Sequence, residues 1–407
     1  SPGIVLHTGS SGGTVRLVQQ KLTSRGERLK DDGKYGASTA AAVQRFQRRN
    51  SLTADGSVTA RFSDNGKHGF ILTVEGNGAI PDYASAKEAP WYYRSGRVTS
   101  IAIEEGITAV GDNAFAECAV GSVVLPRSMV SVGEKSFPQD AQVCAYSQVN
   151  AKDGRKVFLY SETKPQTDGE YWRFKNGVAV VWETIRVLFI GNSFTYYSDI
   201  PSLFGQIAEG AGEMVEVDSV TNGSWTLTKF ADETDEYGKQ VSDKLNATDE
   251  YDVVVLQEQS TRPLTNYSAF ESAVRALKAK IKGTQENCEI YLYSTWGYAE
   301  AAETRKETIP ELEAEIRKAY EKAAGELNLQ VCQVGKAFST VYTEYPDINL
   351  YFGDNKHPSY VGAYLSACVH AATILGCDVR ETTFDGTLES DTAALLRGVA
   401  YETVFGA

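Results

Sequence analysis

The sequence predicts a multidomain protein with a small all-helical module, a β-rich repetitive segment and an α/β domain built on a parallel sheet. Three observations support this prediction. The chain has 407 residues, more than one domain usually holds. Residues 98–137 contain a repeat with an offset of 22 residues, which is typical of stacked units. From Ile185 onward, strand-like and helical patterns alternate, as in parallel sheets covered by helices. We expect these three parts to span residues 1–66, 67–184 and 185–407.

The first part carries two amphipathic helical patterns separated by a turn. The first helical pattern includes Val15, Val18 and Leu22, and the second spans residues 40–47. The turns are Asp32-Gly33-Lys34-Tyr35-Gly36, between the two helical patterns, and Asp55-Gly56, after them. They resemble the three-helix peptidoglycan-binding module, and most of them would form its core. The resemblance implies binding to a cell wall through residues 1–62, an inference by analogy of fold.

The second part is β-rich and partly repetitive. Residues 98–115 align with residues 120–137, so that Val110 matches Val132 and Phe115 matches Phe137. This pattern resembles the leucine-rich repeats of bacterial surface antigens. Two units bury little core, so neighbouring residues must cap the stack. Aromatic residues here can form a sugar-binding platform or, as we favour, capping and interface contacts. They are Trp91, Tyr92, Tyr93, Tyr171, Trp172 and Trp182.

The third part alternates strands with helices. Its first strand, Val187-Leu188-Phe189-Ile190, has the composition of a strand buried on both faces. A parallel sheet with helices on both faces is therefore predicted. Further strands are expected at residues 215–220, 252–256, 289–294 and 329–334, and helices at residues 201–211, 269–282, 309–327 and 359–375.

A candidate nucleophile follows the first strand in Gly191-Asn192-Ser193. A sharp turn at the glycine would place the Ser193 hydroxyl at the carboxyl edge of the sheet, where open α/β sheets bind ligands. The alternative is that this turn only caps a helix. A serine nucleophile needs a base with an acidic partner. Of four histidines, His357 has a suitable setting, because Asp354 precedes it by three residues.

Two sequence blocks resemble those of the SGNH (GDSL-type) hydrolases: Gly191-Asn192-Ser193-Phe194-Thr195 and Asp354-Asn355-Lys356-His357-Pro358-Ser359. The family usually has Asp where this chain has Asn192. The resemblance covers residues 185–407 and implies a three-layer, flavodoxin-like fold. It also implies that Ser193 is the nucleophile, His357 the base and Asp354 its orienting acid, with no metal or cofactor. His370 lies within a helical run and is expected to be packed.

The resemblance further implies an oxyanion hole that includes the N–H groups of Ser193 and Gly223, the latter in the second block. The third block, usually Gly-x-Asn-Asp, is replaced by Gln257-Glu258-Gln259-Ser260. Gln259 takes the position of the Asn, and its amide can donate to an oxyanion; Gln257 is a rival for this role. Two further residues are candidates to line the substrate pocket, Asn192 and Trp296, although Trp296 can equally be a buried residue at a strand end.

Charge and composition exclude several classes. The net charge is −13, but residues 1–62 carry +6 and the remainder −19, which argues against nucleic acid as the main partner. No apolar run reaches 18 residues, so no membrane span is expected. The six cysteines lack Cys-x-x-Cys spacing, so no zinc site is expected and most should be buried thiols. A pairing of Cys368 with Cys377 stays open.

These patterns together predict a secreted or wall-associated bacterial serine esterase. Its substrate would be a cell-wall polysaccharide such as peptidoglycan, or another polysaccharide, from which it removes O-acetyl groups. The alternative is a surface adhesin or scaffold whose hydrolase-like domain is idle, a reading prompted by the unusual third block.

Overall fold

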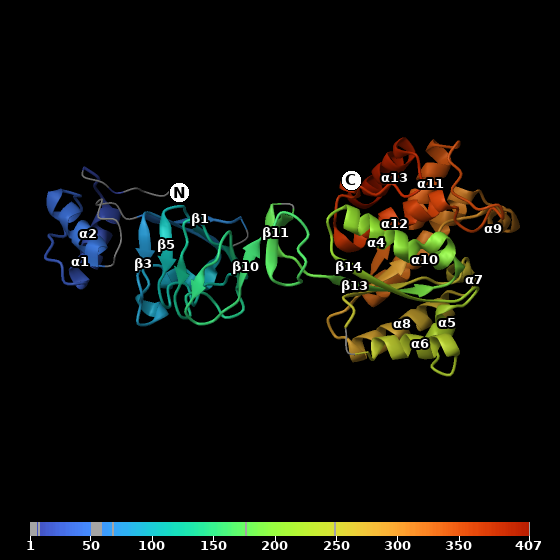
Figure 1. Cartoon of the computed structure of the whole chain (residues 1–407), viewed down its shortest axis with the longest axis horizontal. Coiled ribbons are helices and arrows are strands. Elements are labelled where there is room, and N and C mark those ends of the chain that lie inside the picture. The colour runs from blue at the N-terminus through green and yellow to red at the C-terminus, as the bar shows by residue number, and fades with distance from the viewer. Residues whose placement is uncertain are drawn as a thin grey trace. The chain divides into compact units, whose positions relative to one another are not determined.

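The computed structural model describes residue 6 and residues 9–49, 59–66, 69–175, 177–247 and 250–406. The chain forms two compact units, Ser1–Trp182 and Glu183–Ala407, which are described separately (Figure 1). The predicted fold class is confirmed: the first unit begins with helices and continues with β-strands, and the second is an α/β domain with a parallel sheet.

The helical region contains α1 (Gly13–Ser24) and α2 (Ala37–Arg49), which pack around a small core that includes Val15, Leu22 and Val43. The buried Gln19 amide fixes the turn between the helices. Its Oε1 accepts from the Gly33 N–H at 2.8 Å, and its Nε2 donates to the Lys34 carbonyl at 3.0 Å. The predicted turn Asp55-Gly56 lies outside the described residues.

The β-rich segment begins earlier than the sequence indicated. β1 (Thr59–Asp64) pairs antiparallel with β2 (Phe70–Glu75), and β2 pairs in parallel with β4 (Val98–Ile103). The boundary expected between residues 66 and 67 therefore falls inside the β1–β2 hairpin. Short polar strands such as β1 carry no clear alternation, so this boundary was not evident in the pattern.

The repeat predicted at an offset of 22 residues is a stack of parallel strands. Val110 on β5 pairs with Val132 on β7, and the Phe115 and Phe137 rings stack with centroids 5.4 Å apart. Trp91 stacks on Phe115 at 5.0 Å and continues this aromatic column. The strands of one ladder are β3 (Gly78–Ile80), β5 (Ile107–Val110), β7 (Ser131–Val132) and β9 (Asn150–Ala151).

The stack continues beyond the two repeats that the sequence shows. Val123 pairs with Val143, and Val132 pairs with Ala151, so the next unit is offset by 20 or 19 residues instead of 22. This change of spacing hides the third unit from a search for a fixed period. The second ladder comprises β6 (Ser122–Val124), β8 (Gln142–Ala145), β10 (Val157–Tyr160), β11 (Tyr171–Lys175) and β12 (Val178–Val181).

The aromatic residues of this segment are mostly internal. Trp91, Trp172 and Trp182 are buried, whereas the Tyr93 side chain is 70% exposed. The Trp172 indole N–H donates to the Ala145 carbonyl at 2.9 Å and thereby ties β11 to β8. The tryptophans therefore serve packing, as we favoured from the sequence.

The second unit is a five-stranded parallel sheet in the order β14-β13-β15-β16-β17. The first strand leads into the Ser193 turn and lies beside the centre of the sheet, so its carboxyl end is flanked by neighbouring strands. The strands are β13 (Ile185–Gly191), β14 (Val215–Thr221), β15 (Val253–Leu256), β16 (Glu289–Tyr293) and β17 (Gln330–Cys332).

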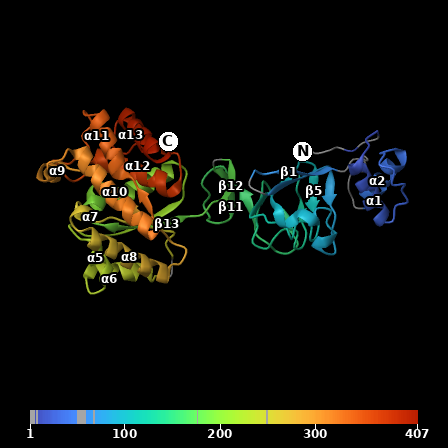
Figure 2. The same ribbon diagram turned by 180° about the vertical axis from the view of Figure 1, so that it is seen from behind.

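Helices cover both faces of this sheet, which gives three layers (Figures 1 and 2). One core lies against α4 (Ile200–Gly210), α11 (Val334–Glu344), α12 (Tyr360–Leu375) and α13 (Ser390–Phe405). The other core lies against α5 (Leu227–Ala231), α6 (Glu236–Leu245), α8 (Tyr267–Thr284) and α10 (Ile309–Leu327). The shorter helices are α3 (Ser193–Tyr196), α7 (Arg262–Thr265) and α9 (Ala299–Arg305).

Two further expectations concern the whole chain. All six cysteines are buried and none forms a disulfide, so Cys368 and Cys377 are not bridged. Among the residues that the structure describes, no helix combines the length and apolar character needed to cross a membrane.

The repeat stack generates a stability prediction. A Cβ at Gly133 would collide with the backbone of Gly111 and Asp112 in the preceding unit. Gly133→Ala should therefore lower the free energy of unfolding of the first unit by about 1–3 kcal/mol, the usual cost of overpacking. Gly121→Ala is the matched control, because nothing lies within 4 Å of its Cβ position. Calorimetry that finds equal thermal transitions for both variants would contradict the close approach of the units.

Candidate active site

The nucleophile turn begins where β13 ends. Asn192 is the N-cap of α3: its Oδ1 accepts from the Phe194 N–H at 3.1 Å, and its Nδ2 donates to the Trp225 carbonyl at 3.0 Å. Ser193 is the first residue of α3 and remains partly exposed. The turn therefore caps a helix and also presents the Ser193 hydroxyl at the carboxyl edge of the sheet.

Gly191 is required for space and not for a left-handed backbone. It is absent from the described glycines with positive φ. A Cβ at this position would collide with Thr195 Oγ1 and lie 2.7 Å from Gln257 Oε1. The expectation that Gly191 provides conformational freedom is thus corrected: it allows the strand end to lie against the Gln257 side chain.

The histidine loop is organised by Asp354. Its Oδ1 accepts from the backbone N–H groups of Lys356 and His357, at 3.1 and 3.0 Å. Asn355 adopts a positive φ of 56°, which Asn tolerates in tight turns. The Trp296 indole N–H donates to the Lys356 carbonyl at 3.0 Å and anchors the loop to the end of β16.

The structure brings Ser193, His357 and Asp354 into one hydrogen-bonded chain. His357 Nε2 lies 2.8 Å from Ser193 Oγ, and His357 Nδ1 lies 2.5 Å from Asp354 Oδ2. Asp354 therefore uses one oxygen to shape the loop and the other to hold the imidazole. With Nδ1–H donated to the carboxylate, Nε2 is the acceptor that faces the serine hydroxyl.

Aromatic rings fix the plane of the His357 imidazole. The Tyr197 ring stacks on it with centroids 4.2 Å apart, and the Phe194 ring meets it edge-on at 5.5 Å. Both rings come from the segment that carries Ser193. The nucleophile and the surface that orients its base are thus provided by one stretch of chain.

The charge of Asp354 suits its orienting role. Burial would raise its pKa, but the hydrogen bonds from the His357 ring and from the backbone N–H groups of His357 and Lys356 outweigh burial and hold the pKa below its usual value. The carboxylate therefore stays ionised at neutral pH and can stabilise a proton taken up by the imidazole.

His370 has the role expected from its place in a helix. It is fully buried in α12, packs edge-on against Tyr293 with centroids 4.4 Å apart, and lies against Phe189. Burial lowers its pKa to about 3, so this side chain is neutral throughout the physiological range.

The two candidate oxyanion glutamines differ sharply. Gln257 is fully buried, and its Oε1 accepts from the Asn192 N–H at 2.8 Å and from Thr195 Oγ1 at 2.9 Å, while its Nε2 donates to the Glu258 carbonyl. Both groups of its side-chain amide are engaged beneath the nucleophile turn, so we retain Gln259 as the candidate for the oxyanion hole. Gln259 is partly exposed, and its side-chain amide has no hydrogen-bond partner among the described residues.

The Gly223 N–H lies on the loop that follows β14. It donates to the Asn222 Oδ1 at 3.0 Å, so an oxyanion would have to replace that side chain. Tyr196 Oη lies 3.1 Å from the position that a Gly223 Cβ would take, which leaves little room for a larger residue. Gly223 and Ser193 are therefore brought to the same edge of the sheet.

The two suggested substrate-lining residues are both buried. Asn192 is buried and its amide is used in capping. Trp296 is buried and stacks between Phe194 and Phe338, with centroids 4.7 and 4.2 Å away. The alternative reading of Trp296 as a buried residue at a strand end is the one that the structure supports.

The sequence did not single out three aromatic residues beside the serine and histidine. Tyr196 is 40% exposed, Phe352 is 56% exposed, and Tyr197 lies between Phe352 and the imidazole. The signal for Tyr196 and Tyr197 was the run Phe194-Thr195-Tyr196-Tyr197 directly after Ser193.

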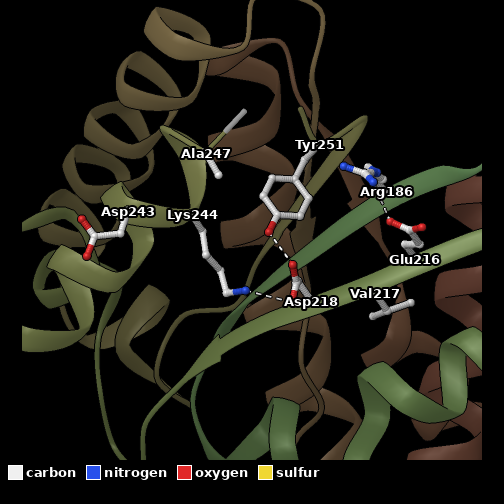
Figure 3. A pocket seen from close by; sticks show the side chains of 8 residues that line it. All are labelled: Arg186, Glu216, Val217, Asp218, Asp243, Lys244, Ala247 and Tyr251. Carbon is white, nitrogen blue, oxygen red and sulfur yellow. Dashed lines mark hydrogen bonds and ion pairs between the residues drawn. The ribbon is translucent and has the colours of Figure 1, made fainter. Parts of the chain in front are cut away.

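A separate hollow of about 570 Å³ lies at the opposite ends of the strands (Figure 3). Four of its charged groups form two pairs: Arg186 with Glu216 at 2.9 Å, and Lys244 with Asp218 at 2.8 Å. Because Arg186 lies near the start of β13 and Ser193 follows its end, this hollow is distinct from the candidate active site.

A comparison with protein families finds a match in the first unit. Residues 11–62 match a family model described as "Putative peptidoglycan binding domain", which confirms the resemblance predicted for the first part. No curated protein matches the chain.

Solved structures with similarity to this chain include a protein from Slackia heliotrinireducens described as "a putative SGNH hydrolase". It is 24% identical, with a TM-score of 0.41, and the alignment covers 47% of this chain and 100% of that chain. A DUF4886 family protein from Bacteroides uniformis is 17% identical with a TM-score of 0.47, covering 55% and 95%. An acetyl xylan esterase is 17% identical with a TM-score of 0.37, covering 47% and 100%.

The contrast between the two glutamines can be measured. Gln257→Leu should lower the free energy of unfolding of the second unit by about 1–3 kcal/mol or more, because the buried Asn192 N–H and Thr195 hydroxyl lose their acceptor. Gln259→Leu, the same change two residues away, should stay within about 0.5 kcal/mol. Denaturant unfolding of both variants is the measurement. Equal losses would mean that Gln257 does not support the nucleophile turn.

Proposed function

We propose that the second unit is a serine esterase of the SGNH type that removes O-acetyl groups from a bacterial cell-wall polysaccharide. The observation that carries this proposal is the hydrogen-bonded chain from Ser193 Oγ through His357 to Asp354, at 2.8 and 2.5 Å. This is the arrangement that activates a serine hydroxyl toward an acyl carbon.

The reaction follows from these positions. Ser193 Oγ attacks the acyl carbonyl carbon while His357 Nε2 takes the hydroxyl proton, and Asp354 stabilises the resulting imidazolium. The imidazolium then protonates the departing sugar oxygen, which leaves an acyl-serine. Water attacks that ester, His357 accepts its proton and returns it to Ser193 Oγ, and the carboxylic acid departs. The N–H groups of Ser193 and Gly223 and the amide of Gln259 would stabilise the oxyanion of both tetrahedral intermediates.

Two features favour a sugar substrate. Exposed Tyr196 lies on α3 with Ser193, and exposed Phe352 lies against Tyr197, which stacks on His357. Aromatic faces can bury the apolar side of a sugar ring while leaving its hydroxyls in water. The match of residues 11–62 to a peptidoglycan-binding family supports a wall as the place where the enzyme acts. A wall location would require export of the protein, which we include in the proposal.

The first test is the hydrolysis of a chromogenic acetyl ester. Ser193→Ala should reduce kcat/KM by about 10⁴-fold or more, and Gln259→Ala by about 100- to 1000-fold, the usual cost of one oxyanion donor. Both side chains are partly exposed, so neither change should alter thermal unfolding substantially. If wild type and Ser193→Ala hydrolyse the ester at the same rate, the esterase proposal is wrong and the adhesin alternative is favoured.

The sugar preference is tested with substrates of two sizes. Phe352→Ala should raise KM for an acetylated oligosaccharide about tenfold, because about 1–2 kcal/mol of ring contact is lost, while kinetics with a small acetyl ester stay unchanged. Tyr345→Ala is a control, since Tyr345 is also exposed but lies at the end of α11. A loss of equal size on both substrates would point to damage of the His357 loop instead.

Wall binding is tested by co-sedimentation with purified sacculi. A truncation that removes residues 1–49 leaves β1 intact and should abolish retention without changing kcat on the small ester. Because the predicted binding residues are part of a basic module, retention should also decrease as salt is raised. Full retention of the truncated chain would assign binding to another part of the protein.

A further inference from the structure

Glu258 is a fully buried carboxyl group that the proposed reaction does not use. It follows β15, between the two glutamines discussed above. Its Oε1 accepts two backbone hydrogen bonds, from the Gln259 N–H at 2.6 Å and from the Leu227 N–H at 3.2 Å. Burying a carboxyl group costs free energy, so a buried carboxyl group beside a candidate site needs a physical explanation.

The two N–H groups belong to the two loops that carry oxyanion candidates. Leu227 begins α5, four residues after Gly223, and Gln259 is itself the other candidate. The neighbouring Gln257 accepts from Asn192 and Thr195 at the nucleophile turn. Adjacent side chains after β15 therefore tie together the carboxyl ends of three neighbouring strands, β13, β14 and β15.

We propose that Glu258 is a positioning residue whose ionised carboxylate holds the Gly223 and Gln259 loops at the spacing needed to bind an oxyanion. The expected effect of Glu258 on catalysis rests on the proposed function. Its effect on the two loops can be measured without assuming that function. The proposal gives a structural role to Gln257-Glu258-Gln259-Ser260, the segment that stands where the SGNH family usually has Gly-x-Asn-Asp.

The charged surroundings of Glu258 are few. Its Oε2 faces Arg262 Nε at 3.8 Å and accepts no hydrogen bond from the described residues. Arg262 in turn donates to Thr228 Oγ1 at 3.3 Å, at the start of α5. From α10, the Tyr320 hydroxyl accepts the Glu258 N–H at 3.2 Å. The carboxylate thus contacts α5, α7 and the two loops, and the backbone N–H of the same residue contacts α10.

Protonation should loosen this tie. Burial raises the pKa of Glu258 to about 7, against the opposing effects of the two N–H groups and Arg262. Hydrogen bonds to a carboxylate are stronger than those to a neutral acid, so the loops are held most firmly when Glu258 is ionised, above about pH 7.

Ionisation of Glu258 should lower the free energy of unfolding while it supports activity. The unfolded chain releases this proton near pH 4.5, the ordinary pKa of Glu, whereas the folded protein keeps it until about pH 7. The free energy of unfolding therefore falls as pH rises between these values. An opposite pH trend of activity and stability is not expected of a residue that only fills the core.

Glu258→Gln keeps the shape of the side chain and removes the charge. At about pH 8 this variant should lose about 100-fold in kcat on the small acetyl ester, with little change in KM, because the donors are misplaced. Below about pH 7, kcat/KM of the wild type should fall toward that of the variant, because protonation of Glu258 removes the charge that the variant lacks.

Glu313→Gln is the matched control. Glu313 is also buried, its pKa is also raised by burial, and it pairs with Arg317 at 3.2 Å on α10, away from the two loops. It should leave kcat and the pH profile of kcat/KM unchanged. A similar loss in both variants would attribute the effect to general destabilisation and overturn the proposal.

Hydrogen–deuterium exchange tests, independently of activity, whether Glu258 holds the two loops in place. After correction for intrinsic rates, the amides of residues 222–227 and 258–262 should exchange faster in Glu258→Gln at about pH 8, as they do in the wild type at about pH 6. Unchanged protection in the variant overturns the proposal. If no ester is cleaved by the wild type, the proposed function fails, and the exchange data still decide whether Glu258 holds the loops.

Discussion

The site depends on one hydrogen bond, between Ser193 Oγ and His357 Nε2, which joins residues 164 positions apart in the chain. A hydroxyl and an imidazole can share a proton only within a narrow range of distance and angle. Each partner is therefore also held in place by the groups around it. Ser193 is fixed by the Asn192 cap and by Gln257 beneath the turn, and His357 is fixed by Asp354.

The packing around this bond explains several residues that have no chemical role. Tyr197 stacks on the imidazole, Phe194 meets its edge, and Trp296 holds the carbonyl of Lys356 while it lies against Phe194. These rings form a continuous aromatic support from the end of β16 to the histidine loop. A site on such a support needs little rearrangement before reaction, which is the condition for electrostatic stabilisation of a transition state.

The residues that follow β15 connect three neighbouring strand ends. Gln257 and Glu258 face inward and connect the nucleophile turn with the Gly223 loop, whereas Gln259 is partly exposed at the edge of the sheet. The cost is a buried carboxyl group with a raised pKa. Buried polar groups of this kind, costly for stability and placed beside a site, are expected where function and stability compete.

The sequence by itself determined what depends on local pattern. It indicated the buried first strand, the Ser193 turn, the Asp354 and His357 pair within one loop, and the 22-residue stack in which Val110 meets Val132. Tertiary structure alone decided what depends on distant neighbours. Gln257 and Gln259 are identical in type and two positions apart, so only their partners distinguish them. Trp296, Tyr197 and the shorter third unit of the stack were likewise undecided, because burial and register arise from contacts that no local period records.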